Sequence, residues 1–275
     1  MDLSPSRKHK TSSAVAHNLL DLQIFHNCKK GVSNGPTGPQ SLPKTDHFLF
    51  VYGSLMHCKS RKRTLPSSTS SVPCILKGFL RLWSYNCRNV YTAVAVTEIS
   101  KDLIRRKGWE DIHDMGVNGL LLPIHTMAEL EDCDEREKHY KRTRLEFQDL
   151  SFDFPFHVPV LGSDVISHLK LPTTTVYTYA LRNSPHILPS HSPSPAVPLS
   201  QQYLDIILLG CLNVHFDFAV HFLKTTIAFS RKFLIDDRHR GRDHFKEWPK
   251  EESALVDILL RMWDDGNAAI PEVKS

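Results

Sequence analysis

The segment Phe48-Leu-Phe-Val-Tyr-Gly-Ser-Leu55 is the most informative stretch of this chain of 275 residues. Its apolar and aromatic run ends at a glycine and a serine, which predicts a buried strand at residues 47–52 followed by a tight turn. A turn of small residues exposes backbone N–H groups that can hold a carboxylate or an oxyanion without a positive side chain. An ordinary turn at a strand end would have the same composition, so the segment alone leaves both interpretations open.

The segments that follow predict a fold in which strands outnumber long helices. Runs rich in β-branched and aromatic residues indicate strands at residues 74–85, 90–98, 117–124, 142–150 and 174–181. Helices are expected at residues 127–132, where Thr126 and Glu129 form a capping box, at residues 200–223 with Ser200 as N-cap, and at residues 253–263. Because strands do not alternate regularly with long helices, we expect an α+β fold with a mainly antiparallel, barrel-like sheet and a few flanking helices.

Composition divides the chain into three parts. Residues 1–45 mix Ser, Lys, Asn, Gly and Pro with little hydrophobic period and are expected to form a disordered basic tail. Residues 46–224 are expected to form one domain with long loop insertions, and residues 225–275 a C-terminal helical extension packed on that domain. The segments expected to be irregular are residues 60–73, 99–116, 151–172 and 182–200.

The net charge of +4 lies entirely in the tail, which has six basic and two acidic residues. The rest of the chain is neutral, and this argues against nucleic acid as a partner, because a nucleic-acid-binding domain normally has a basic face in its folded part. No run of about 18 apolar residues predicts a membrane span. We expect a cytoplasmic protein, although residues 1–45 are Ser-rich and acid-poor, as an organellar transit peptide is. The six cysteines are scattered without CxxC spacing, which favours free thiols over a zinc site.

A second informative segment is Asp134-Glu135-Arg136-Glu137, which Tyr140 and Arg142 follow. Such a run of charges usually forms a solvated surface. This one, however, lies at the end of a predicted helix and just before a predicted strand. There, one carboxylate can point inward, where desolvation raises its pKa and suits it to general-base work.

Together, and in this order, the two segments resemble the γ-glutamylcyclotransferase-like superfamily, which includes γ-glutamylcyclotransferases, γ-glutamylamine cyclotransferases and ChaC-like glutathione-degrading enzymes. The resemblance is carried by residues 48–55, 76–80, 117–124, 130–140 and 203–211. The first looks like the family's opening strand and substrate loop of YGS type, and the fourth is similar to its "LD-x-x-E" stretch. In that stretch Asp134 matches the aspartate, Glu137 falls on the catalytic glutamate, and Cys133 stands where leucine is usual.

The resemblance implies an enzyme that cyclises a γ-glutamyl group to 5-oxoproline and releases an amine or amino acid. It implies that Glu137 is the general acid/base. It further implies that a small γ-glutamyl substrate is the partner and that neither a metal nor a cofactor takes part. The residues expected to bind the substrate are Tyr52, Gly53, Ser54, Leu55, Tyr140 and Tyr203.

Several alternatives stay open. The same fold could serve as a non-catalytic small-ligand binding or interaction module, since fold does not guarantee function. The substrate could be glutathione, a γ-glutamyl amino acid or γ-glutamyl-ε-lysine. The pairing of Tyr140 with Arg142 favours the γ-glutamylamine type, whereas Arg136-Glu137 is similar to the ChaC-like pattern. The sequence does not predict the oligomeric state.

Overall fold

The computed structural model describes residues 45–87, 90–98, 101–156, 158, 163–181, 193–240 and 250–267. All of them belong to one compact unit of the chain. Apart from Thr45, the predicted tail of residues 1–45 lies outside the described residues, and so does much of the predicted loop at residues 182–200.

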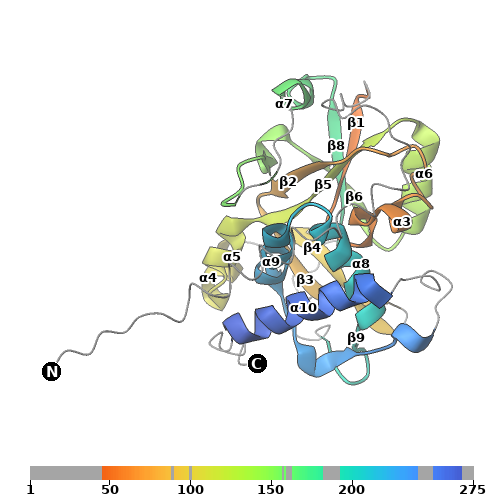
Figure 1. The fold of residues 1–275 in the computed structure, drawn as a ribbon. Coiled ribbons are helices and arrows are strands. Elements are labelled where there is room, and N and C mark those ends of the chain that lie inside the picture. The colour runs from red at the N-terminus through yellow and green to blue at the C-terminus, as the bar shows by residue number, and fades with distance from the viewer. Residues whose placement is uncertain are drawn as a thin grey trace. The chain divides into compact units, whose positions relative to one another are not determined.

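The predicted first strand lies inside a six-stranded sheet (Figure 1). β1 (His47–Val51) pairs antiparallel with β5 (Val117–Ile124) and parallel with β8 (Thr175–Ala180). β2 (Val72–Leu76), β6 (Lys141–Leu145) and β7 (Leu150–Ser151) complete the order β6-β8-β1-β5-β2-β7. Residues 48 to 51 are at most 4% exposed, so both faces of β1 are covered, which explains why its sequence is continuously apolar.

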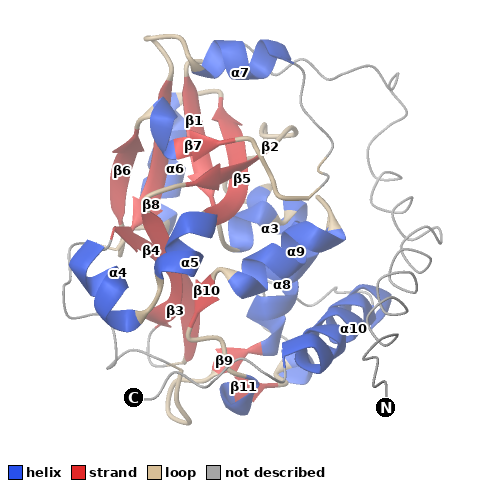
Figure 2. Ribbon diagram, turned by 90° about the vertical axis from the view of Figure 1, so that its left-hand side faces the viewer, coloured by secondary structure: helices blue, strands red, loops and turns tan. Residues whose placement is uncertain are grey.

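A second sheet has the order β10-β3-β4-β9-β11 (Figure 2). Its main part is the antiparallel pair β3 (Phe79–Cys87) and β4 (Tyr91–Glu98). The short strands β9 (Leu199–Ser200), β10 (Thr226–Ile227) and β11 (Leu234–Ile235) pair in parallel. Among the longer pairings only that of β1 with β8 is parallel within the described residues, which confirms an α+β fold with a mainly antiparallel, curled sheet.

The single strand predicted at residues 74–85 is wrong. The chain turns at Gly78, whose φ is 79°, so that β2 ends in the first sheet and β3 begins in the second. A glycine takes this left-handed conformation without the steric penalty that a side chain would add. The uninterrupted apolar pattern of the segment arises because both strands are largely buried.

Helices cover the sheets and connect their strands (Figure 2). The α-helices are α3 (Cys58–Arg61), α4 (Lys101–Lys107), α5 (Glu110–Met115), α6 (Met127–Arg136), α7 (Ser163–Leu169), α8 (Gln201–Leu212), α9 (Phe216–Lys224) and α10 (Lys250–Asn267). The 3-10 turns are η1 (Ser54–Met56), η2 (Phe147–Asp149), η3 (Arg231–Phe233) and η4 (Arg238–Arg240). The predicted helix at residues 253–263 is thus confirmed and is longer than expected.

Three segments expected to be irregular contain helical residues. The first of them, residues 60–73, includes the end of α3, which begins at Cys58. In the second, α4 and α5 are mostly charged, but Ile104 and Trp109 are buried against Leu80 and Leu82 of β3. Two anchoring side chains are too few to produce a visible helical period, so the sequence pattern resembled a loop. The third segment contains α7.

The one long helix predicted at residues 200–223 is two helices. Ser200 caps α8, as predicted, by accepting a hydrogen bond from the backbone N–H of Tyr203 at 3.2 Å. The helix ends at Asn213, and the ring of His215 then accepts a hydrogen bond from the backbone N–H of Asp217 to begin α9. Histidine is not one of the usual N-cap residues, and the apolar residues continue at helical spacing on both sides of it. The sequence therefore showed no boundary between the two helices.

Helix α6 extends to Arg136, four residues beyond its predicted end. Thr126 caps it by accepting a hydrogen bond from the N–H of Glu129 at 3.2 Å, and the carboxylate of Glu129 accepts one from the N–H of His125 at 2.9 Å. In the predicted capping box the Glu129 carboxylate would accept from the N–H of Thr126, but it accepts from the N–H of the preceding residue, His125, instead. The longer helix places Glu137 at its C-terminal end.

Candidate functional site

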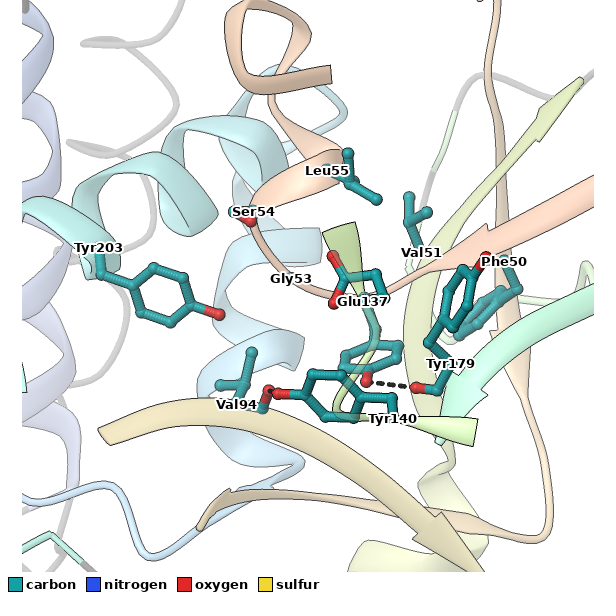
Figure 3. A pocket seen from close by; sticks show the side chains of 11 residues that line it. Phe50, Val51, Gly53, Ser54, Leu55, Val94, Glu137, Tyr140, Tyr179 and Tyr203 are labelled. Carbon is teal, nitrogen blue, oxygen red and sulfur yellow. Dashed lines mark hydrogen bonds between the residues drawn. The ribbon is translucent and has the colours of Figure 1, made fainter. Parts of the chain in front are cut away.

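All seven residues that the sequence analysis assigned to catalysis or substrate binding line one cavity of about 400 Å³, a volume that includes open solvent (Figure 3). They come from segments far apart in the sequence: the end of β1 with η1, the end of α6, and α8. Four further residues complete the lining. These are Phe50, Val51, Val94 and Tyr179.

The loop at the end of β1 is held closely from two sides. A Cβ atom added to Gly53 would lie 3.2 Å from Cγ2 of Val94 and 3.6 Å from the hydroxyl of Tyr203, so a side chain there would crowd the cavity wall. On the other side, a Cβ on Gly210 of α8 would lie 2.9 Å from the backbone of Met56. The glycine thus allows α8 to touch η1 directly, and this contact brings Tyr203 to the cavity.

Glu137 is the only ionisable carboxylate among the eleven described residues of the lining. Its side chain points into the cavity (Figure 3) and is 21% exposed. Desolvation raises the pKa of Glu137, while the neighbouring Arg136, whose Nε lies 3.2 Å from Oε1 of Glu137, partly opposes this rise. A carboxylate that faces a cavity and has a raised pKa is better suited to accept a proton and to return it than a fully solvated one.

Tyrosines surround this carboxylate. The hydroxyl of Tyr52 donates to the backbone carbonyl of Tyr179 at 2.5 Å, and that of Tyr140 donates to the carbonyl of Val94 at 3.4 Å. Burial raises the pKa of Tyr52, Tyr140 and Tyr203, and the nearby Glu137 charge raises each of them further. All three phenols therefore stay neutral at physiological pH and can act as hydrogen-bond donors.

Aromatic packing holds two of these tyrosines in place. The ring of Tyr140 lies 5.0 Å from that of Tyr85, and the ring of Tyr203 lies 6.0 Å from that of Trp83, edge to face. Both partners are on β3, where the strand register shifts between Trp83 and Tyr85. Such a bulge changes the direction of side chains on either side of it. One strand therefore supports two walls of the cavity.

The neighbouring carboxylates have other partners. Asp134 accepts hydrogen bonds from the hydroxyl of Tyr179 at 2.7 Å and from Arg142 at 2.6 Å. Glu135 is exposed and pairs with Lys138 at 2.8 Å. Neither lines the cavity. Of the three acidic side chains in the run, the structure therefore brings Glu137 alone to the cavity.

Other reactive groups near the loop do not join the site. His57 is buried, and its burial lowers the pKa to about 4, while Cys58 begins α3; neither lines the cavity. Within the described part of the chain, no group of three His, Cys, Asp or Glu side chains could hold a metal ion. The described cysteines are all free thiols. No described helix has the length and apolar character needed to cross a membrane.

The sequence analysis missed Val94, Tyr179 and the contacts of Arg136. Tyr179 and Tyr177 lie two residues apart on β8, so their side chains are on the same face of the strand. The sequence shows this alternation but does not indicate which face lines the cavity. Val94 is an ordinary apolar strand residue, and no sequence signal distinguishes it from its neighbours. Arg136 was considered as part of a charge run and of the ChaC-like pattern but was given no role in the site, although its guanidinium contacts both Glu137 and Ser54.

No protein-family model matches the chain, and no curated protein matches it. Among solved structures, a gamma-glutamyl cyclotransferase is similar with a TM-score of 0.43 and 13% identity, covering 78% of this chain and 98% of that chain. An uncharacterized human protein has a TM-score of 0.40 and 14% identity, covering 76% and 97%. A yeast gamma-glutamyl cyclotransferase described as specific to glutathione has a TM-score of 0.38 and 15% identity, covering 65% and 96%.

Proposed function

We propose that the protein is a γ-glutamylcyclotransferase-type enzyme, which cyclises a γ-glutamyl group to 5-oxoproline and releases an amine or amino acid. The supporting observation is that the residues chosen for this chemistry from the sequence meet at one cavity, where Glu137 is the one carboxylate among the described lining residues. A cavity lined by neutral phenols and backbone amides suits a small zwitterion better than a large charged partner.

In the proposed reaction Glu137 accepts a proton from the α-ammonium group of the substrate. The freed amine attacks the γ-carbonyl carbon, which closes the five-membered ring and places negative charge on the carbonyl oxygen. A second proton passes from the ring nitrogen to the leaving nitrogen, and the bond between that nitrogen and the carbonyl carbon breaks. Glu137 then returns its proton to the released amine, so the reaction has no net uptake or release of protons.

Two physical effects would supply most of the rate. Holding the substrate in a ring-like pose can remove on the order of 7–11 kcal/mol of barrier, because the attack is intramolecular. Backbone N–H groups of Gly53, Ser54 and Leu55 are the proposed donors to the oxyanion or to the substrate carboxylate. Losing one preorganised donor of this kind typically costs about 2.7–4 kcal/mol.

The test is to incubate the purified protein separately with glutathione, a γ-glutamyl amino acid and γ-glutamyl-ε-lysine, and to measure 5-oxoproline by mass spectrometry. Release from one substrate supports the proposal and names the substrate class. Release from none contradicts it and favours the non-catalytic binding module. The exposed Glu135→Gln serves as the control for Glu137→Gln, since both replace one carboxylate of the same run.

A further inference from the structure

The guanidinium of Arg136 connects the carboxylate of Glu137 to the Ser54 loop, which also lines the cavity. Its Nε lies 3.2 Å from Oε1 of Glu137, and one terminal nitrogen donates to Oγ of Ser54 at 3.1 Å. That nitrogen also donates to Oγ of Ser60 at 3.2 Å. The other terminal nitrogen donates to Oγ1 of Thr64 at 2.8 Å and to the carbonyl of Ser60 at 3.3 Å.

Only an arginine can make this set of contacts. All three nitrogens of the planar guanidinium are engaged, and they point along different edges toward α6, α3 and η1. A lysine would bring the same charge on a single ammonium and could not span the three elements at once. The side chain is 26% exposed, so these contacts are only partly screened by solvent.

Few other charged groups act on the carboxylate of Glu137. Besides Arg136, the titratable groups that interact electrostatically with Glu137 are Cys133 of α6, His139 and Tyr140 in the turn after α6, Tyr52 just after β1, and Tyr203 of α8. Burial keeps the three phenols and the Cys133 thiol neutral, because it raises the pKa of each. Arg136 is the larger of the two influences that lower the pKa of Glu137, and His139 is the smaller.

We propose that Arg136 is a positioning residue, which fixes the Ser54 loop and the Glu137 carboxylate in one geometry beside the cavity. This inference rests on the proposed function, since it assigns Arg136 a part in the same site. Arg136 need not touch the substrate. It acts by partly opposing the rise in the pKa of Glu137 that desolvation causes, and by holding the loop at a constant distance from the carboxylate.

The experiment compares Arg136→Met and Arg136→Lys with Arg144→Met, which removes the same charge from an exposed side chain on β6. We expect Arg136→Met to lower kcat by about 100-fold, since small displacements in an active site have effects of that order. It should also move the acid limb of the pH–rate profile to higher pH. Arg136→Lys should leave that limb near its wild-type position but still lower kcat, because the bridge to Ser54 and Thr64 is lost. Arg144→Met should change neither.

A second measurement does not depend on turnover. NMR titration of carboxyl-labelled glutamate, without substrate, should show a higher titration midpoint for Glu137 in Arg136→Met than in the wild type. If no γ-glutamyl compound is turned over, the proposed function fails while this titration still decides whether Arg136 acts on Glu137. If the enzyme is active but Arg136→Met leaves both kcat and the titration unchanged, the positioning role is wrong and the function stands. Wild-type kcat in Arg136→Lys would overturn the bridging role, and this variant retains the charge should Arg136→Met fail to fold.

Discussion

Two arginine–carboxylate pairs in this protein differ in how completely the carboxylate is satisfied. Asp205 of α8 is fully buried, and Arg238 donates to it from two nitrogens at 2.6 and 2.8 Å. Gln201 donates to it as well, at 2.8 Å. Glu137 is 21% exposed and faces a cavity, with a single 3.2 Å contact to Arg136. With Ser253 as a further donor at 3.4 Å, Asp205 accepts four hydrogen bonds and is saturated, whereas a carboxylate with one partner beside a cavity can accept a proton.

The pair of Arg238 and Asp205 also links two helices. Arg238 donates to Asp257 of α10 at 2.9 and 3.2 Å, so it joins α8 to the C-terminal helix. The two carboxylates raise the pKa of Arg238 above its ordinary value, which keeps it charged at every physiological pH. We therefore interpret the Arg238 pair as structural and the Arg136 pair as functional.

The strongest challenge to this comparison is Glu137→Gln. We expect it to lower the rate of 5-oxoproline release by about 10²–10⁴-fold, which is the usual contribution of a general acid/base. The melting temperature should not fall, because the amide has the same shape as the carboxylate. Full activity in Glu137→Gln, or a comparable loss in Glu135→Gln, would show that the carboxylate was chosen wrongly.

Arg238→Ala tests the structural side of the comparison. Removing one member of a buried pair leaves an uncompensated charge, here on Asp205, so we expect a loss of about 3–5 kcal/mol in the free energy of unfolding. Urea denaturation measures this loss. Arg231→Ala is the matched control, since Arg231 pairs with Asp264 of α10 at a site where both side chains are nearly half exposed. Such a pair is worth about 0–1 kcal/mol, and equal losses in the two variants would remove the distinction.

Gly53→Ala sharpens the comparison at the cavity itself. The added methyl would lie 3.2 Å from Cγ2 of Val94, so it narrows the space beside Glu137 without touching the Arg238 pair. We expect kcat/KM to fall by about tenfold, as one methyl group in a pocket typically causes. Combining it with Val94→Ala should restore part of the loss. An unchanged kcat/KM in Gly53→Ala would place the substrate elsewhere.

The smallest predicted effect is the pH dependence of stability at Glu137. Its pKa is raised in the folded state, so the protonated form is favoured there, and the stability that this gives is fully present below the unfolded pKa. That stability is lost as the pH rises through the folded pKa. Glu137→Gln should therefore melt at a higher temperature than the wild type at pH 7, and the difference should shrink toward pH 4. Calorimetry of both proteins over this range checks the sign, and a lower melting temperature at pH 7 would contradict it.

Local patterns were enough to identify several parts of the fold and of the candidate site. The apolar run of β1, the hydroxyl caps at Thr126 and Ser200, and the short motifs around Tyr52 and Glu137 each depend on neighbours within a few residues. Hydrophobic period and capping are properties of such short windows. The sequence could therefore indicate these elements and name seven of the eleven described residues that line the cavity.

Long-range packing accounts for what the sequence did not show. Gly78 separates two strands into different sheets, and α9 begins anew at His215, yet neither break interrupts the apolar pattern. Tyr179 and Val94 reach the cavity because β8 and β4 pack near β1, and Arg136 meets Ser54 across 82 residues of chain. Contacts between residues so far apart in the sequence depend on how sheets and helices pack. This packing cannot be predicted from the pattern of a few neighbouring residues. Local sequence patterns therefore indicated the candidate residues, and the tertiary structure decided that Glu137, among the described carboxylates of its charge run, faces the cavity.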